Sequence, residues 1–211
     1  MTKLDPVNIE TKDRMPKLVA FDLDYTCWDL WVDTHVTPPL KRRGANDVNQ
    51  IFDRYGTRMS YYPEVPSILL QLHHSNVHVA AVSRTSAPKA AKQALTELLV
   101  PGSLRDMTTT RAVATKHDPL KKQSSEGLIA SINLFDTLEI YPGSKLNHFK
   151  TIHEDTGIAY DEMLFFDDES RNKEVTRLGV TFVLVRDGVN RKLFESGLEA
   201  WRKQLSSKAP A

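Results

Sequence analysis

Five short apolar runs, each ending at or next to a polar or charged residue, constrain the fold of this chain more than any other feature. The runs are Lys17–Phe21, Val77–Val82, Glu139–Tyr141, Met163–Phe166 and Thr181–Val185. Their apolar residues follow one another without the alternation that marks a strand with one wet face. They therefore predict strands that are buried on both faces, as in a parallel sheet.

Segments with helical spacing of apolar residues separate these runs. The expected helices cover Pro66–His74, Ser86–Leu99, Ser144–Asp155, Ser170–Leu178 and Asn190–Leu205. Ser86 is placed to cap the second helix, and Gly179 is placed to end the fourth. Because strands and helices alternate, we expect an α/β fold with a doubly wound, mainly parallel sheet and helices on both faces.

Two stretches interrupt this alternation. Asp29–Tyr62 follows the first strand, and Gly102–Thr137 is a polar segment of a length that indicates a functional or partly disordered loop. We interpret residues 1–211 as a single domain with insertions at about 29–62 and 102–137. We expect disorder around Lys116–Gly127.

Charge and cysteine content narrow the classes of function. The 28 basic and 27 acidic residues leave a formal net charge of +1, so a nucleic-acid partner is not expected. The single cysteine, Cys27, cannot form an internal disulfide, which favours a reducing compartment. The chain has no apolar run of membrane-spanning length and no signal-peptide pattern at its start, so we expect no membrane association and a cytoplasmic or nuclear location.

The residues at the strand ends indicate phosphate chemistry. The carboxyl ends of parallel strands meet at one edge of a sheet, where ligands bind. That edge would gather Asp22 and Asp24, Ser83, Lys145, and the pair Asp167 and Asp168. Phosphoryl transfer depends on positioning and charge compensation, for which carboxylates hold a hard cation such as Mg²⁺ and a lysine supplies a compact positive charge.

These residues also follow the order of the four motifs of the haloacid dehalogenase superfamily, which the chain resembles. Six local blocks are similar to the eukaryotic magnesium-dependent phosphatase group, a branch with almost no cap. They are Phe21–Thr26, Trp31–Val36, Tyr62–Pro66, Ser83–Ser86, Tyr141–Lys145 and Phe165–Glu169. The resemblance implies a haloacid dehalogenase-like fold with a minimal cap, although Asn46–Ser60 and much of the second insertion depart from the family pattern.

The resemblance also implies a role for each site residue. Asp22 would be the nucleophile that forms an aspartyl-phosphate, and Asp24 would act as general acid and base. Mg²⁺ would bind the Asp22 carboxylate, the Asp24 backbone carbonyl and one acidic residue of the fourth strand. The family pattern favours Asp168 over Asp167 as that ligand. Contacts to phosphate or substrate are assigned to the Leu23 backbone N–H, Ser83, Arg84 and Lys145.

The substrate stays open at this point. A capless site accepts phosphotyrosine-like side chains of phosphoproteins or small sugar phosphates. The alternatives are a nucleic-acid 3′-phosphatase of the same chemistry, which the charge balance disfavours, and a non-catalytic phosphate-binding protein of this fold, which the intact residue set disfavours. Cys27 is interpreted as a small apolar filler. Trp28 and Trp31 fit either the core or the wall of the site entrance.

Overall fold

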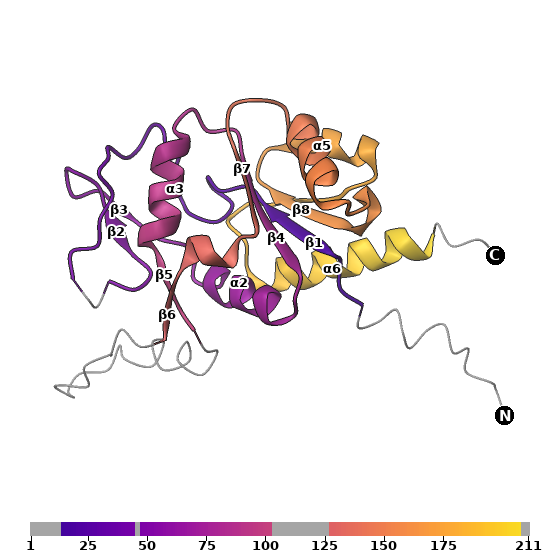
Figure 1. Cartoon of the computed structure of the whole chain (residues 1–211), viewed down its shortest axis with the longest axis horizontal. Coiled ribbons are helices and arrows are strands. Elements are labelled where there is room, and N and C mark those ends of the chain that lie inside the picture. The colour runs from indigo at the N-terminus through magenta and orange to yellow at the C-terminus, as the bar shows by residue number, and fades with distance from the viewer. Residues whose placement is uncertain (1–13, 45–46, 103–126, 208–211) are drawn as a thin grey trace.

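A five-stranded parallel sheet with the order β7-β4-β1-β8-β9 forms the centre of the protein (Figure 1). The computed structural model describes residues 14–44, 47–102 and 127–207. The strands are β1 (Leu18–Phe21), β4 (His78–Ser83), β7 (Thr137–Ile140), β8 (Met163–Asp167) and β9 (Thr181–Leu184). All five overlap the apolar runs of the sequence, so the predicted parallel sheet is confirmed.

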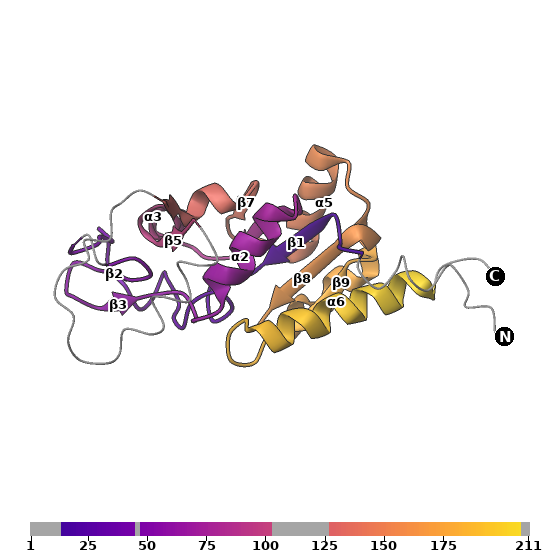
Figure 2. The ribbon, with the colours of Figure 1, turned by 90° about the horizontal axis from the view of Figure 1, so that it is seen from below.

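Helices cover both faces of this sheet. They are α2 (Val65–His74), α3 (Pro88–Glu97), α5 (Lys145–Thr156) and α6 (Arg191–Ser206), with 3-10 helices η2 (Tyr160–Glu162) and η3 (Ser170–Leu178). One core cluster contains side chains of α2, α3 and α6, and the other contains side chains of α5 and η3. Figure 2 shows α6 running along one face of the sheet, with α5 on the other side. The doubly wound α/β fold is therefore confirmed.

The division of the β1 side chains explains the continuous apolar runs. Val19 and Phe21 belong to the α2 side of the core, whereas Leu18 and Ala20 belong to the α5 side. Alternate side chains of a strand point to opposite faces, so a strand between two helical layers needs an apolar residue at every position.

Two local predictions were wrong. The segment Ser170–Leu178 is a 3-10 helix and not an α-helix, and the N–H of Asn172 donates to the carbonyl of Glu169 three residues earlier. Ser86 does not cap α3, whose N-cap is Ala87. Ser86 instead donates both its backbone N–H, at 3.2 Å, and its hydroxyl, at 2.9 Å, to Asp33 Oδ2, and these charge-assisted bonds hold it outside the helix.

The first insertion, Asp29–Tyr62, contains a small sheet that the sequence did not reveal. Its strands are β2 (Ile51–Phe52) and β3 (Arg58–Met59), which pair antiparallel. Lys41 pairs with Phe52 on the other side of β2. Figure 2 shows this unit beyond the edge toward which β1 and β8 point.

The end of the second insertion is also part of the fold. Strand β5 (Leu99–Pro101) pairs antiparallel with β6 (Leu128–Ala130), and the 3-10 helix η1 (Ser131–Leu134) follows. The expected disorder at Lys116–Gly127 lies, except for Gly127, outside the described residues. Within the described residues, no helix is both long enough and apolar enough to cross a membrane.

The strand order reverses at β1, since the chain passes from β1 to β4 and β7 and returns to β8 on the other side. In doubly wound sheets, ligands bind outside the carboxyl ends of the strands at this reversal. Asp22, directly after β1, donates its N–H to the Phe166 carbonyl of β8 at 2.9 Å. This bond holds the start of the Asp22 loop at the reversal point.

Candidate active site

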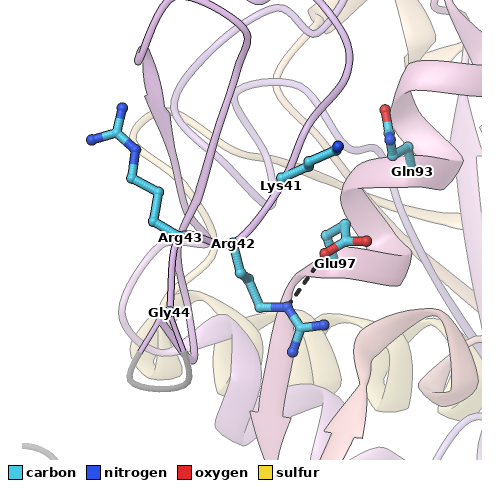
Figure 3. Close-up of a pocket in the computed structure, with 6 residues that line it drawn as sticks. All are labelled: Lys41, Arg42, Arg43, Gly44, Gln93 and Glu97. Carbon is cyan, nitrogen blue, oxygen red and sulfur yellow. Dashed lines mark hydrogen bonds and ion pairs between the residues drawn. The ribbon is translucent and has the colours of Figure 1, made fainter.

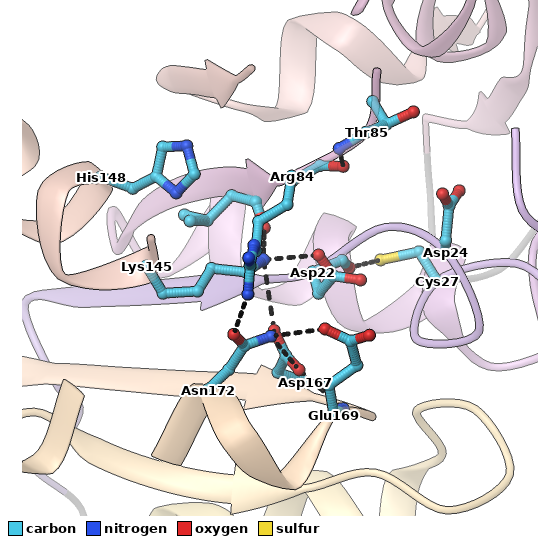
Figure 4. Close-up of polar contacts among 12 residues, drawn as sticks. Asp22, Asp24, Cys27, Arg84, Thr85, Lys145, His148, Asp167, Glu169 and Asn172 are labelled. Atoms are coloured by element: carbon cyan, nitrogen blue, oxygen red, sulfur yellow. Dashed lines mark hydrogen bonds and ion pairs between the residues drawn. The ribbon is translucent and has the colours of Figure 1, made fainter. Parts of the chain in front are cut away.

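Asp22, Lys145 and Asp167 form a buried ionic centre at the carboxyl edge of the sheet (Figure 4). Lys145 Nζ lies 2.5 Å from Asp22 Oδ1 and 3.2 Å from Asp167 Oδ2, and it also donates to the Val82 carbonyl. Lys145 and Asp167 are fully buried, and Asp22 is 9% exposed. The convergence of the first, third and fourth strand ends that the sequence predicts is thus present.

The position of Lys145 depends on these two carboxylates. Lys145 is the first residue of α5, whose N-cap Ser144 accepts the Asn147 N–H at 3.4 Å. A cation is unfavourable at the N-terminus of a helix and is rarely buried without a partner. His148, one turn later in α5, adds no charge at neutral pH, because burial and the nearby Lys145 lower its pKa to about 4.

The acidic groups of the site carry more negative charge than Lys145 offsets. Burial raises the pKa of Asp22; the Lys145 ammonium opposes this rise, and the Asp167 carboxylate adds to it. Burial also raises the pKa of Asp24 to about 6. Burial and the neighbouring Asp167 raise the pKa of Asp168 to about 6. A divalent cation bound among these groups would favour their ionised forms.

The donors at this edge fit Mg²⁺. Mg²⁺ is commonly held by one or two carboxylates together with waters and substrate oxygens. The expected ligands are the Asp22 and Asp168 carboxylates with the Asp24 backbone carbonyl. Across the described ranges, no three Asp, Glu, His or Cys side chains converge in a metal-binding cluster. The expected set needs only two such side chains, because its third ligand is a backbone carbonyl.

Trp28 and Val32 orient the side chain of Asp24. Asp24 Oδ1 accepts the Trp28 Nε1–H at 2.6 Å and the Val32 N–H at 3.2 Å. Trp28 is fully buried, so of the two positions considered for it, the core and the wall of the site entrance, it occupies the core. Trp31 is 49% exposed and packs against Tyr25 and His35, with ring centroids 5.5 and 5.6 Å away. An exposed aromatic group therefore lies directly beyond the Asp24 loop.

Cys27 behaves as the expected small core residue. It is fully buried, and its Sγ donates to the Asp22 carbonyl at 3.2 Å. Burial raises the pKa of its thiol, with Asp22 and Asp24 adding to the effect. A neutral, buried thiol is a poor nucleophile, so Cys27 does not compete with Asp22 for that role.

The remaining predicted contacts lie around the same edge. Ser83 ends β4, is almost fully buried, and accepts the Thr85 N–H on its Oγ at 3.2 Å. Arg84 is half-buried and its Nη1 donates to Asn172 Oδ1 at 3.2 Å. The Leu23 side chain is fully buried in the core, so only its backbone can reach a substrate. Their contacts with phosphate or substrate stay predictions.

Asn172 belongs to the site but was not predicted from the sequence. Its Nδ2 donates to both carboxylate oxygens of Asp167 at 2.9 Å, and its Oδ1 accepts from Arg84 (Figure 4). Asp167 also accepts the Glu169 N–H at 2.8 Å. Asp167 is therefore saturated by protein donors, whereas Asp168 is only half-buried. The only feature of the sequence that could have pointed to Asn172 is its place, as an amide side chain, five residues after the end of β8.

This arrangement places the chain among the haloacid dehalogenase-like hydrolases. Residues 14–204 match the Acid Phosphatase family, and the chain belongs to that family. This match confirms the expectation of a phosphatase, and the relatives described next confirm the resemblance to magnesium-dependent phosphatases.

The names of similar proteins agree with this family assignment. A HAD-like hydrolase superfamily protein of Schizosaccharomyces pombe is 46% identical over 80% of this chain and 84% of its own length. Magnesium-dependent phosphatase 1 of Homo sapiens is 39% identical over 90% of this chain and 89% of its own length. The expected cofactor, Mg²⁺, agrees with the name of the human relative.

Proposed function

We propose that this phosphatase hydrolyses phosphate monoesters through a covalent aspartyl-phosphate on Asp22, with Mg²⁺ as its cofactor. Its proposed substrates are phosphotyrosine-like groups or small sugar phosphates. The observation that carries the proposal is the position of Asp22 at the reversal of strand order, with Oδ1 held 2.5 Å from Lys145 Nζ. The free and buried Cys27 suits the reducing interior of the cytoplasm or nucleus.

The geometry supports a two-step reaction. Lys145 holds one oxygen of Asp22, so the other oxygen is available to attack phosphorus as the bond to the leaving oxygen breaks. Asp24 gives its proton to the leaving oxygen of the substrate. It then takes a proton from the water that attacks the aspartyl-phosphate. Inorganic phosphate leaves and the Asp22 carboxylate is restored.

The charges around Asp22 support this order of events. Asp22, the Asp24 carbonyl and Asp168 would hold Mg²⁺, which would supply the positive charge that an anionic carboxylate needs to approach an anionic phosphate. Lys145, Ser83 and the backbone N–H of Leu23 would contact the phosphoryl oxygens, where negative charge is spread in the transition state. Asp167 holds Lys145, with Nζ 3.2 Å from its Oδ2, and in this proposal would support the metal site without being a ligand.

The exposed aromatic side chains favour phosphotyrosine-like substrates. Trp31, Tyr25 and His35 form a connected group next to Asp24. Aromatic rings attract one another in stacked or edge-to-face pairs, so an aryl leaving group gains a contact that a sugar does not. Arg84, held by Asn172, faces the substrate in the proposed site.

Metal removal tests the proposed function. Hydrolysis of an aryl phosphate should vanish in excess chelator and return with Mg²⁺. Ca²⁺ should inhibit, because its longer and more numerous oxygen contacts would draw in the second oxygen of Asp22 and block its attack. Full activity in excess chelator, or recovery with Zn²⁺ alone, would contradict the proposal.

A further inference from the structure

The first insertion exposes a concentration of positive charge that the reaction does not use. Its exposed side chains define what we call the insertion surface: Lys41, Arg42, Arg43, Arg54, Tyr55 and Arg58. Tyr55 is 78% exposed, far more than the other aromatic side chains. A group of exposed cations creates a positive potential at the surface, which attracts an anionic partner.

A pocket of about 400 Å³ separates the insertion surface from α3 (Figure 3). Its lining residues are Lys41, Arg42, Arg43, Gly44, Gln93 and Glu97. Glu97 pairs with Arg42, Nε to Oε2, at 3.3 Å. In the part of the chain that the structure describes, no acidic side chain forms an ion pair with Lys41, Arg54 or Arg58. The pocket therefore keeps a net positive charge.

The insertion surface is held in a defined shape. Asp53 Oδ1 accepts the Tyr55 and Thr57 N–H groups at 2.8 and 2.7 Å, which closes the β2–β3 turn. Its Oδ2 accepts the Thr37 N–H at 2.9 Å and ties the turn to the chain that leads from the active site. Burial opposes ionisation, but these bonds prevail and lower the pKa of Asp53. A preformed surface loses less conformational entropy on binding than a flexible loop.

The packing of Arg43 adds to this order. Its guanidinium carbon lies 3.9 Å from the centre of the Phe52 ring, which is a cation–π contact. The turn favours glycine at position 56, because its φ of +92° is a conformation that other residues rarely adopt.

The insertion surface also lies on the side of the molecule where the substrate binds. It is beyond the carboxyl edge of the sheet (Figure 2). The segment that joins it to the Asp22 loop carries the exposed Trp31 and His35. A small sugar phosphate at Asp22 would not span both regions, whereas an extended polypeptide with a phosphorylated side chain would.

We propose that the insertion surface binds an acidic segment of a phosphoprotein whose phosphorylated side chain enters the Asp22 site. The inference rests on the proposed function and narrows its substrates to phosphoproteins with acidic residues near the phosphorylated residue. A protein partner fits better than a nucleic acid, because single-stranded nucleic acids stack on successive aromatic side chains and this surface exposes one, Tyr55.

Two synthetic phosphotyrosine peptides of equal length test the inference. In one, Asp and Glu flank the phosphotyrosine, and in the other Asn and Gln replace them. Wild-type enzyme should hydrolyse the acidic peptide with a kcat/KM roughly fivefold higher, as expected for a few exposed ion pairs, and added salt should remove the difference. Equal kcat/KM values for the two peptides at low salt would overturn the inference.

Variants locate the effect. The double variant Lys41→Gln with Arg58→Gln should bring the peptide ratio close to one and leave hydrolysis of a small aryl phosphate unchanged. The matched control, Lys150→Gln with Lys203→Gln, removes the same charge from exposed positions on α5 and α6 and should keep the ratio. An unchanged ratio in the first variant, or an equal loss in the control, would overturn the proposal. If the first variant does not fold, Arg54→Gln with Arg58→Gln replaces it.

Peptide binding and RNA competition distinguish a failure of the proposed function from a failure of this inference. If neither peptide nor the aryl phosphate is hydrolysed, the proposed function fails. Fluorescence anisotropy with the same peptides still decides the inference then: a preference for the acidic peptide that the double variant loses supports it, and equal binding overturns it. A short single-stranded RNA that competes more strongly than the unphosphorylated acidic peptide would assign the surface to nucleic acid and overturn the proposal.

Discussion

The ionic centre at Asp22 and the insertion surface both concentrate charge, but in opposite ways. In the centre, Lys145 lies 2.5 and 3.2 Å from two carboxylates and all three residues are almost completely shielded from water. On the insertion surface, the cations are exposed and Lys41, Arg54 and Arg58 have no ion-pair partner among the described residues. Buried charges depend strongly on their partners, whereas exposed charges act almost independently and are screened by salt. This difference in burial fits a catalytic role for the ionic centre and the proposed docking role for the insertion surface.

Removal of the nucleophile should have the largest effect. Asp22→Asn keeps the shape of the side chain but removes the attacking carboxylate, so hydrolysis of an aryl phosphate should fall on the order of 10⁴-fold or more. Asp29→Asn, at an exposed position of the following loop, is the matched control and should retain activity. A correctly folded Asp22→Asn protein with near-wild-type turnover would remove the basis for the comparison.

Replacing one lysine in each region compares directly how much the two regions contribute to stability. Lys145→Met leaves Asp22 and Asp167 together without their cation, and the loss of one partner of a buried pair should lower the free energy of unfolding by about 3–5 kcal/mol. Lys41→Met removes an exposed charge and should change it by less than about 0.5 kcal/mol. Denaturant unfolding of the two variants measures both values. Equal losses would show that burial does not distinguish the two regions.

Asn172 should matter through the groups that it holds. Asn172→Leu removes both bonds to Asp167 and the bond to Arg84, so kcat should fall roughly 10–100-fold, as for other groups outside the ligand set that support a metal site. The Mg²⁺ concentration for half-maximal activity should rise, which a purely structural role would not cause. Asn147→Leu, on the exposed side of α5, is the control. Wild-type Mg²⁺ dependence in Asn172→Leu would limit Asn172 to a structural role.

The smallest predicted effect is a shift in the pH profile. Asp24 must be protonated to act as the general acid, and its pKa is raised to about 6, so kcat/KM should fall as the pH rises past that value. The bond from Trp28 Nε1 favours the ionised carboxylate and lowers this pKa. Trp28→Phe should therefore raise the pKa and move the falling limb to higher pH by about one unit.

Trp201→Phe controls for the loss of indole volume in the core. Trp201 is also fully buried, and its Nε1 donates to the Asp161 carbonyl, away from Asp24. This variant should keep the wild-type pH profile. A shift to lower pH in Trp28→Phe, or the same shift in both variants, would contradict the role assigned to the Trp28 bond.

The parallel sheet and the convergence of its strand ends could be predicted from the sequence. Strands between two helical layers are apolar at every position, as in Leu18–Phe21, and this pattern is visible without a structure. The carboxyl ends of such strands necessarily share one edge, which brings Asp22, Lys145 and Asp167 together.

Features that depend on side-chain competition could not be predicted. Ser86 was assigned to a helix cap, but its hydroxyl donates a hydrogen bond to Asp33, more than fifty residues earlier. Asn172 bonds to Asp167 five residues earlier, a contact that depends on how the chain turns after β8. The two-residue strands Ile51–Phe52 and Arg58–Met59 are too short to show any periodicity, so their sheet emerged only from the structure.

The central claim, that Asp22 carries the phosphoryl group, can be tested directly by trapping. A mixture of enzyme, Mg²⁺ and aryl phosphate is quenched during turnover and treated with borohydride, which reduces an acyl phosphate to an alcohol and converts a phosphorylated aspartate to homoserine. Mass spectrometry of the digested protein should then find homoserine at position 22 only in samples that contained substrate. Homoserine at Asp24 or Asp168, or none at all while turnover proceeds, would contradict the account.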